Sequence, residues 1–404
     1  MSETFPAALS PPRTLVAPPG AFRLILAAAV VVSHLSRFDI GRLAVIAFFY
    51  LSGYWTARIW DEKFAGRQTL RFYAARYLRI APLYLLAVAA AALALGRALH
   101  PENLALLGVA TTRRDPIAVT WSLDIELQFY LILPLVMGLA LRLSARWMLA
   151  AAVVVSVIGF WLQAQFGVVT AAKYAPAFVL GVVTFTGRWR PDARTANLSL
   201  TAFLAISLFT AFTPFFDKRV PDPFDRDIYG LFWLLPLLPW VARSLTIRSS
   251  RLDRHLGNLS YPLYLVHWPV IALILPHVGH GLPARLAAAG AAAALAVALY
   301  VLVDRPIDAW RVRVTEKREG EGARPQPASP GLGDPGLAKE LPVAFAAAGR
   351  QTDGAPLPAT VPIGELRRTF ADPPATSAHD ELADADPPFA GDDDRRPRDP
   401  AALR

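Results

Sequence analysis

Residues 21–38 read AFRLILAAAVVVSHLSRF, an apolar stretch with an arginine near one end and a histidine near the other. On a helix, the step from Arg23 to His34 is about three full turns and about 16 Å of rise, so the two side chains share one face. That rise is roughly half the thickness of a bilayer's hydrocarbon core. If Arg23 marks one membrane surface, we expect His34 near the middle, where an ionisable group indicates a functional site. The alternative is a histidine at the end of a short span that reaches interfacial water, since Arg37 and Asp39 follow within five residues.

The composition of the whole chain is that of a membrane protein. Hydrophobic residues make up 54% of the 404 residues and charged residues only 18%, against about 25% in soluble domains. The absence of cysteine excludes disulfides and thiolate metal sites. We predict an all-α polytopic domain over residues 21–307, with about ten transmembrane helices. The ten apolar segments are 22–38, 42–60, 80–96, 121–141, 147–165, 173–188, 197–214, 228–244, 257–276 and 283–304.

The net charge of +9 is distributed as membrane topology requires, which argues against nucleic-acid binding. An even number of spans puts both termini on one side, and that side carries about twice as many Lys and Arg residues as the other. We therefore expect a multi-pass protein of the inner (plasma) membrane with cytoplasmic termini. Residues 1–20 are predicted to be a disordered N-terminus. Residues 308–404, rich in Pro, Ala and Asp, are predicted to be a disordered tail.

A polar stripe runs through TWSLDIELQFYLILP, residues 120–134. Ser122, Glu126 and Tyr130 repeat every four residues and so share one helix face. Ser122 fits an N-terminal cap. Glu126 begins the embedded part, so it is either a structural partner or a site residue, and its natural partners are His34, an arginine or a substrate hydroxyl.

A second histidine, His267, lies in LGNLSYPLYLVHWPV, residues 256–270. It is about ten residues beyond the cytoplasmic edge of its span, which again indicates the middle of the membrane. Two readings are open for it. It either forms a hydrogen bond to a neighbouring helix or takes part directly in catalysis, and two histidines at similar depth suggest a shared polar cavity.

An arginine-rich loop is predicted at residues 61–79. Arg76 and Arg79 are three residues apart and are neighbours on a helix face. Arginine forks suit phosphate groups, although anchoring beside lipid headgroups explains any single arginine as well. No Walker A or GxGxxG pattern follows a strand, so an ATPase or a dinucleotide enzyme has no support.

Taken together, these segments resemble the acyltransferase 3 family of integral-membrane O-acyltransferases. Five matches occur in the family's usual order: the Arg-x10-His first span, FFYLSGYW at 48–55, RYLR at 76–79, WSLDIELQFYLILP at 121–134, and LGNLSYPLYLVHWPV followed by VDRPI at 303–307. One departure is LAVIA before FFYLSG, which lacks the glycine and acidic residue often found there. The tail carries no GDS-type block of a fused esterase domain.

The resemblance implies transfer of an acyl group, usually acetyl from acetyl-CoA, to a hydroxyl of a carbohydrate or related cell-envelope molecule. Acyl-CoA would be a co-substrate, and no permanently bound cofactor or metal is expected. Membrane lipid and a carbohydrate or glycoconjugate acceptor are the other expected partners.

The resemblance also implies roles for individual residues. His34 would be the catalytic base, and Glu126 is the second predicted catalytic residue. Arg23, Arg76 and Arg79 would handle the donor. The expected residues of the substrate cavity are Ser52, Trp121, Ser122, Tyr130 and His267, with Ser52 or Tyr130 supporting an oxyanion. A covalent acyl-histidine is an alternative to direct base catalysis.

Two other classes of protein compete with the enzyme. A secondary transporter or exporter of a lipid-linked sugar or small molecule would also need buried His and Glu side chains. Paired broken spans or an internal repeat would favour it, and the sequence has neither. A membrane sensor that signals through its tail is the third class.

Overall fold

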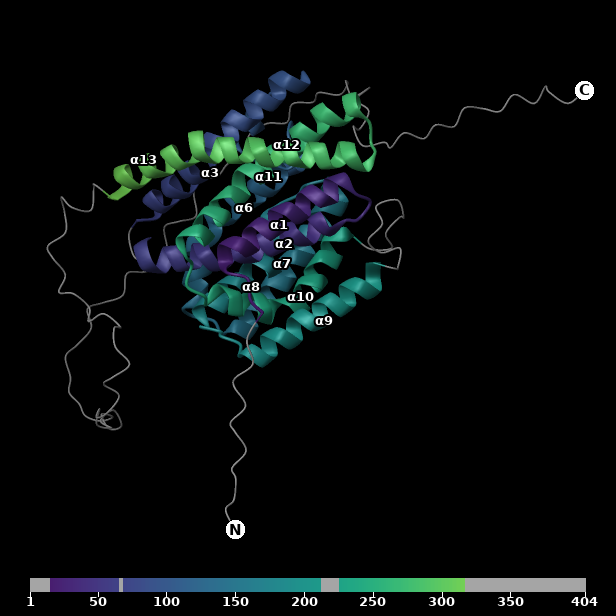
Figure 1. Cartoon of the computed structure of the whole chain (residues 1–404). Helices are drawn as coiled ribbons and strands as arrows, with labels where there is room; N and C mark the ends of the chain where they lie inside the picture. Colours follow the sequence, from purple (N-terminus) through teal and green to yellow (C-terminus); the bar gives the residue numbers. More distant parts are fainter. Residues whose placement is uncertain (1–14, 65–67, 212–224, 317–404) are drawn as a thin grey trace, which may run out of the picture. The chain divides into compact units, whose positions relative to one another are not determined.

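The computed structural model describes residues 15–64, 68–211 and 225–316, and the secondary-structure elements in these ranges are all helices (Figure 1). Each of the ten predicted apolar segments overlaps a helix. These helices are α1 (Pro19–Leu35), α2 (Ile40–Ile59), α3 (Thr69–Leu95), α6 (Thr120–Ala140), α7 (Ala145–Phe166), α8 (Ala175–Thr186), α9 (Ala193–Ala211), α10 (Arg226–Leu245), α11 (Arg251–Val278) and α12 (Leu282–Leu299). The predicted all-α class is confirmed. Two short helices, α4 (Pro101–Ala105) and α5 (Val109–Thr112), connect α3 to α6.

Six helices in the described ranges are long and apolar enough to cross a membrane. Five of them are α3, α6, α7, α10 and α11. The sixth is the continuous helical stretch Leu282–Arg311, which passes from α12 through a π-helical turn, Tyr300–Asp304, into α13 (Arg305–Glu316). Helix α1 and the stretch Ala171–Thr186 are apolar but shorter.

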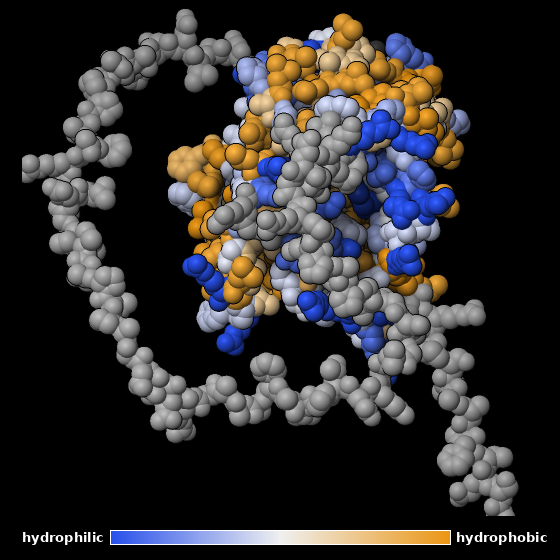
Figure 2. Space-filling model, turned by 90° about the vertical axis from the view of Figure 1, so that its left-hand side faces the viewer, coloured by the Kyte–Doolittle hydropathy of each residue, from blue (hydrophilic) through white to orange (hydrophobic). Residues whose placement is uncertain are grey.

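The outer surface of the helical domain is strongly apolar, as expected for helices that face lipid. Only 22% of the most apolar window of α7 is buried, and its exposed side chains include Val153, Val157 and Trp161. Figure 2 shows broad hydrophobic areas on one face of the molecule, beside groups of hydrophilic residues. Such an apolar surface is incompatible with exposure to water and supports a multi-pass membrane protein.

Helices α1 and α2 lie at the centre of the bundle (Figure 1). Helix α1 packs most closely on α11, and α2 on α8. The contact of α2 with α8 depends on glycine, because a Cβ atom on Gly53 would lie 2.1 Å from the carbonyl oxygen of Phe178, and one on Gly181 would lie 2.1 Å from that of Tyr50. Small residues thus let the two backbones touch.

The predicted loop 61–79 is wrong in its second half. Helix α3 begins at Thr69, so the RYLR motif lies within a helix, while residues 60–64 form a π-helical turn. The prediction followed mean apolarity and stopped at the arginines. The helix instead continues because apolar residues alternate with them, and Phe72 and Ala75 are buried in the core.

Both predicted terminal boundaries also need correction. Helix α13 contains residues 308–316, so the tail does not begin at 308; an ion pair of 2.7 Å between Asp308 and Arg311, one turn apart, supports this helix. At the other end, Trp240 donates a hydrogen bond of 2.5 Å to the carbonyl oxygen of Leu15, which orders residues 15–18 against α10. Residues 1–14 and 317–404 lie outside the described ranges, and their disorder stays a prediction.

Candidate active site

A cavity of about 380 Å³ lies among α1, α2, α3, α6, α11 and α13. Seven of the ten predicted site residues line it: Arg23, Ser52, Arg76, Arg79, Ser122, Glu126 and Tyr130. The other three, His34, Trp121 and His267, do not. Sequence motifs that are more than a hundred residues apart therefore meet in one space, as the arrangement of an active site requires.

The centre of the cavity holds a hydrogen-bonded group of three side chains. Ser52 Oγ donates to Glu126 Oε1 at 2.7 Å and lies 3.4 Å from the hydroxyl of Tyr130. Tyr130 donates to the same carboxylate oxygen. The i,i+4 spacing on α6 brings Glu126 and Tyr130 together, and α2 supplies Ser52. Because both hydroxyl hydrogens point at Glu126, Ser52 and Tyr130 are not positioned to stabilise an oxyanion in this state.

Arginines line the cavity from several helices. The guanidinium of Arg76 lies 5.8 Å from the ring centre of Tyr130, and its buried Nε has no hydrogen-bond partner among the described residues. Arg79 pairs with Asp304 at 2.9 Å, which joins the RYLR and VDRPI motifs. Arg23 and Arg311 complete the set. Glu126 is the one acidic side chain among the described lining residues, so this lining has a positive balance and suits an anionic ligand.

Tyr264 also lines the cavity, and the sequence interpretation missed it. Its hydroxyl lies 2.6 Å from Ser122 Oγ. On its other side, its ring centre is 5.9 Å from that of His267. The sequence did carry a signal for Tyr264. It lies three residues before His267 on the same helix, so both side chains lie on one helix face.

His267 is fully buried directly behind Tyr264. Its Nδ1 donates to the carbonyl oxygen of Tyr264 at 2.8 Å, so Nε2 is the ring nitrogen left for another contact. That Nε2 has no hydrogen-bond partner in the part of the chain that the structure describes. His267 therefore does not line this cavity and contacts it through Tyr264.

His34 is exposed and is the penultimate residue of α1, because the helix ends at Leu35. Its ring centre lies 5.1 Å from that of His267. Helices α1 and α11 run parallel. The backbone N–H of Gly20 donates a hydrogen bond to the side chain of Asp253 near one end of α1, and His34 contacts His267 near its other end. His267 is about 16 Å before the end of α11, so α1 stops well short of that end. The depth of His34 in a membrane stays a prediction.

Trp121 also lies outside the cavity, contrary to prediction. The guanidinium of Arg42 lies 4.8 Å from its ring centre. Its ring also lies 6.4 Å from that of Phe49 and 6.1 Å from that of Tyr174, centre to centre. Trp121 instead packs near a second group of charged side chains.

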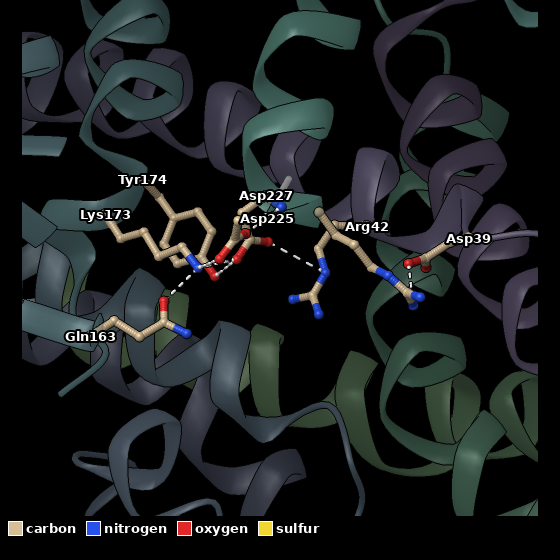
Figure 3. Close-up of polar contacts among 8 residues, drawn as sticks. Asp39, Arg42, Gln163, Lys173, Tyr174, Asp225 and Asp227 are labelled. Atoms are coloured by element: carbon tan, nitrogen blue, oxygen red, sulfur yellow. Dashed lines mark hydrogen bonds and ion pairs between the residues drawn. The ribbon is translucent and has the colours of Figure 1, made fainter. Parts of the chain in front are cut away.

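This second group, which we call the Lys173 cluster, joins α2, α7, the 3-10 helix Ala171–Tyr174 and the start of α10 (Figure 3). Its members are Arg42, Gln163, Lys173, Tyr174, Asp225 and Asp227. Lys173 is 2% exposed, and its Nζ lies 2.6 Å from Asp227 Oδ2 and 3.0 Å from Asp225 Oδ2. Arg42 Nε lies 3.3 Å from Asp227 Oδ1. Two cations thus balance two anions, as in a structural network.

Comparison with known proteins gives one family. The family model described as acyltransferase domain matches residues 19–303 of this chain. Nodulation protein 10 of Rhizobium leguminosarum bv. viciae is 29% identical over 222 residues, which cover 50% of this chain and only 58% of that relative's length. Acyltransferase MdmB of Streptomyces mycarofaciens is 27% identical over 350 residues, covering 72% of this chain and 86% of MdmB. No solved structure matches the chain.

Proposed function

Since the chain belongs to the acyltransferase 3 family, we propose that it moves a short acyl group, acetyl in the first instance, from acyl-CoA to a hydroxyl of a carbohydrate or related cell-envelope molecule. The observation that supports this most is the arginine-lined cavity with Tyr264 in its lining, because Tyr264 contacts His267 and His267 contacts His34. The proposal includes ten membrane crossings, an inner-membrane location and cytoplasmic termini.

The donor would bind through its phosphate groups. Arg76 is the best-placed ligand because its buried Nε lacks a partner, and a guanidinium forms paired hydrogen bonds with phosphate oxygens. Arg23 and Arg311 would add positive charge. The charge of Arg79 is already neutralised by Asp304. Arg79 would therefore hold the RYLR motif in place as well as bind the donor's phosphates. Glu126 would accept a hydrogen bond from an amide N–H of the donor's arm.

The thioester would then lie toward Ser122 and Tyr264, and the side chain of Tyr264 would swing aside to let it meet the acceptor. His34 would take the proton of the acceptor hydroxyl as its oxygen attacks the thioester carbon. The tetrahedral intermediate would collapse with release of the CoA thiolate, which would take up the proton from His34. Exposure of His34 lets an acceptor approach from outside the cavity.

Replacement of His34 tests the proposal. We expect His34→Ala to lower acyl transfer by a factor of about a hundred or more, the range of general-base catalysis, with normal expression and folding. His277→Ala, an exposed histidine near the end of α11, is the matched control and should keep full activity. The readout is mass spectrometry of glycans and lipids from a deletion strain that carries each variant. A folded His34→Ala protein with normal activity would reject the assignment.

A further inference from the structure

The cavity has two chemically different ends. Its lining residues on α2 run from Val45 to Ile59, a rise of about 21 Å. Arg76 lies beside Tyr130, whereas Ser122 is eight residues earlier on α6, or about 12 Å away along the helix. Arg76 therefore belongs to one part of the cavity and Ser122 to the other.

The end at Ser122 is lined mainly by apolar side chains. Val45 and Leu123 are buried there, at 5% exposure each. The ring of Phe48 meets that of Tyr264 edge to face, with centres 6.2 Å apart, and the hydroxyl of Tyr264 is held 2.6 Å from Ser122. Two aromatic rings thus cap a space walled by aliphatic side chains.

This end is also the part of the cavity that lies closest to the histidines. The ring of Tyr264 lies between the cavity and His267, and His267 contacts His34. A donor held by its phosphates at the arginines would extend its opposite end, the acyl thioester, toward this wall.

We propose that Val45, Phe48, Leu123 and Tyr264 form an acyl pocket that selects short acyl groups by length. This inference rests on the proposed function. In the state that the structure describes, the rings of Phe48 and Tyr264 pack against each other at this end, so a long chain could extend past them only by displacing a packed ring. In a hydrophobic pocket, one methylene changes selectivity by about 10- to 200-fold, so an end capped by packed rings gives strong selection.

Competition binding to the purified full-length chain tests the acyl pocket. Labelled acetyl-CoA is displaced by unlabelled acetyl-CoA or hexanoyl-CoA, and the ratio of the two affinities is the readout. The wild type should favour acetyl-CoA at least tenfold, and Phe48→Ala should shift the ratio at least tenfold toward hexanoyl-CoA. The matched control is Ile59→Ala, a partly buried lining residue at the other end of α2, which should leave the ratio unchanged.

The possible failures are distinguishable. A wild-type protein that binds acetyl-CoA but accepts hexanoyl-CoA equally well, or a Phe48→Ala protein with an unchanged ratio, would overturn the acyl pocket alone. A wild type that binds no acyl-CoA would reject the proposed function and the acyl pocket with it. If Phe48→Ala does not yield folded protein, Val45→Ala enlarges the same end and should shift the ratio in the same direction; an unchanged ratio there would likewise overturn the pocket.

Discussion

At the residue scale, the cavity's most informative atom is Nε of Arg76. Buried polar atoms in folded proteins are almost always hydrogen-bonded, and this one has no partner among the described residues. Its neighbour Tyr130 contributes only the face of its ring, while the Tyr130 hydroxyl is directed to Glu126. A ligand that brings an acceptor oxygen would satisfy the guanidinium.

Removing this guanidinium should weaken donor binding. We expect Arg76→Gln to raise the Kd for acetyl-CoA by about 10- to 100-fold, since a hydrogen bond to a charged group contributes about 1.5–3 kcal/mol. Arg71→Gln, on the exposed part of α3, should leave the Kd unchanged. Equilibrium binding to both purified proteins makes the comparison. Equal affinities of the two variants for acetyl-CoA would show that Arg76 does not bind the donor's phosphates.

At the element scale, the Lys173 cluster ties three helices to α10. Lys173 stands in the short 3-10 helix before α8 and reaches Gln163 on α7 and two aspartates at the start of α10 (Figure 3). None of its members lines the cavity. Its effect on function is therefore indirect, through the position of α2, which carries both Arg42 and Ser52.

Removing a charged member of the Lys173 cluster should lower the stability of the fold. Lys173→Met leaves Asp227 buried without its closest cation, so we expect a loss of about 3–5 kcal/mol in the free energy of unfolding. Arg58→Met is the control, because its 2.7 Å pair with Glu62 is exposed and should contribute no more than about 0.5 kcal/mol. Thermal unfolding in detergent compares the two. Similar melting temperatures for both variants would mean that the buried pair contributes little.

At the scale of the whole molecule, the described helices contain every residue that lines the cavity. The last of these along the chain is Arg311 on α13. The cavity lining that the structure describes thus ends at Arg311, and an enzyme with this site is expected to differ in its dependence on the tail from a sensor that signals through it.

Truncation distinguishes these two classes. A chain ending after residue 316 should keep acyl transfer within about twofold, because catalytic effects come from groups at the reacting centre. A chain ending after residue 304 loses Arg311 and should bind acyl-CoA more weakly. Transfer assays in membranes with matched protein amounts compare both with the full chain. Loss of activity on the first truncation, in a folded protein, would assign the tail a direct role.

Much of the fold was predictable from local sequence. Lipid forces a helix to satisfy its own backbone hydrogen bonds, so long apolar runs could be read as helices one at a time, and each predicted segment overlaps one. The errors lie where charged residues continue a helix, as at Arg76 and Asp308. There the helix depends on which side chains face the core, and mean apolarity carries no such information.

The sequence by itself determined the all-helical membrane class, the family and seven of the residues that line the cavity, because each depends on spacing within one segment. Only the tertiary structure decided how the segments meet. It removed His267 and Trp121 from the cavity, added Tyr264 and Arg311, and placed His34 at an exposed helix end beside His267. The physical reason is that the rotation and ending of each helix are set by its neighbours, through contacts such as Gly53 on Phe178.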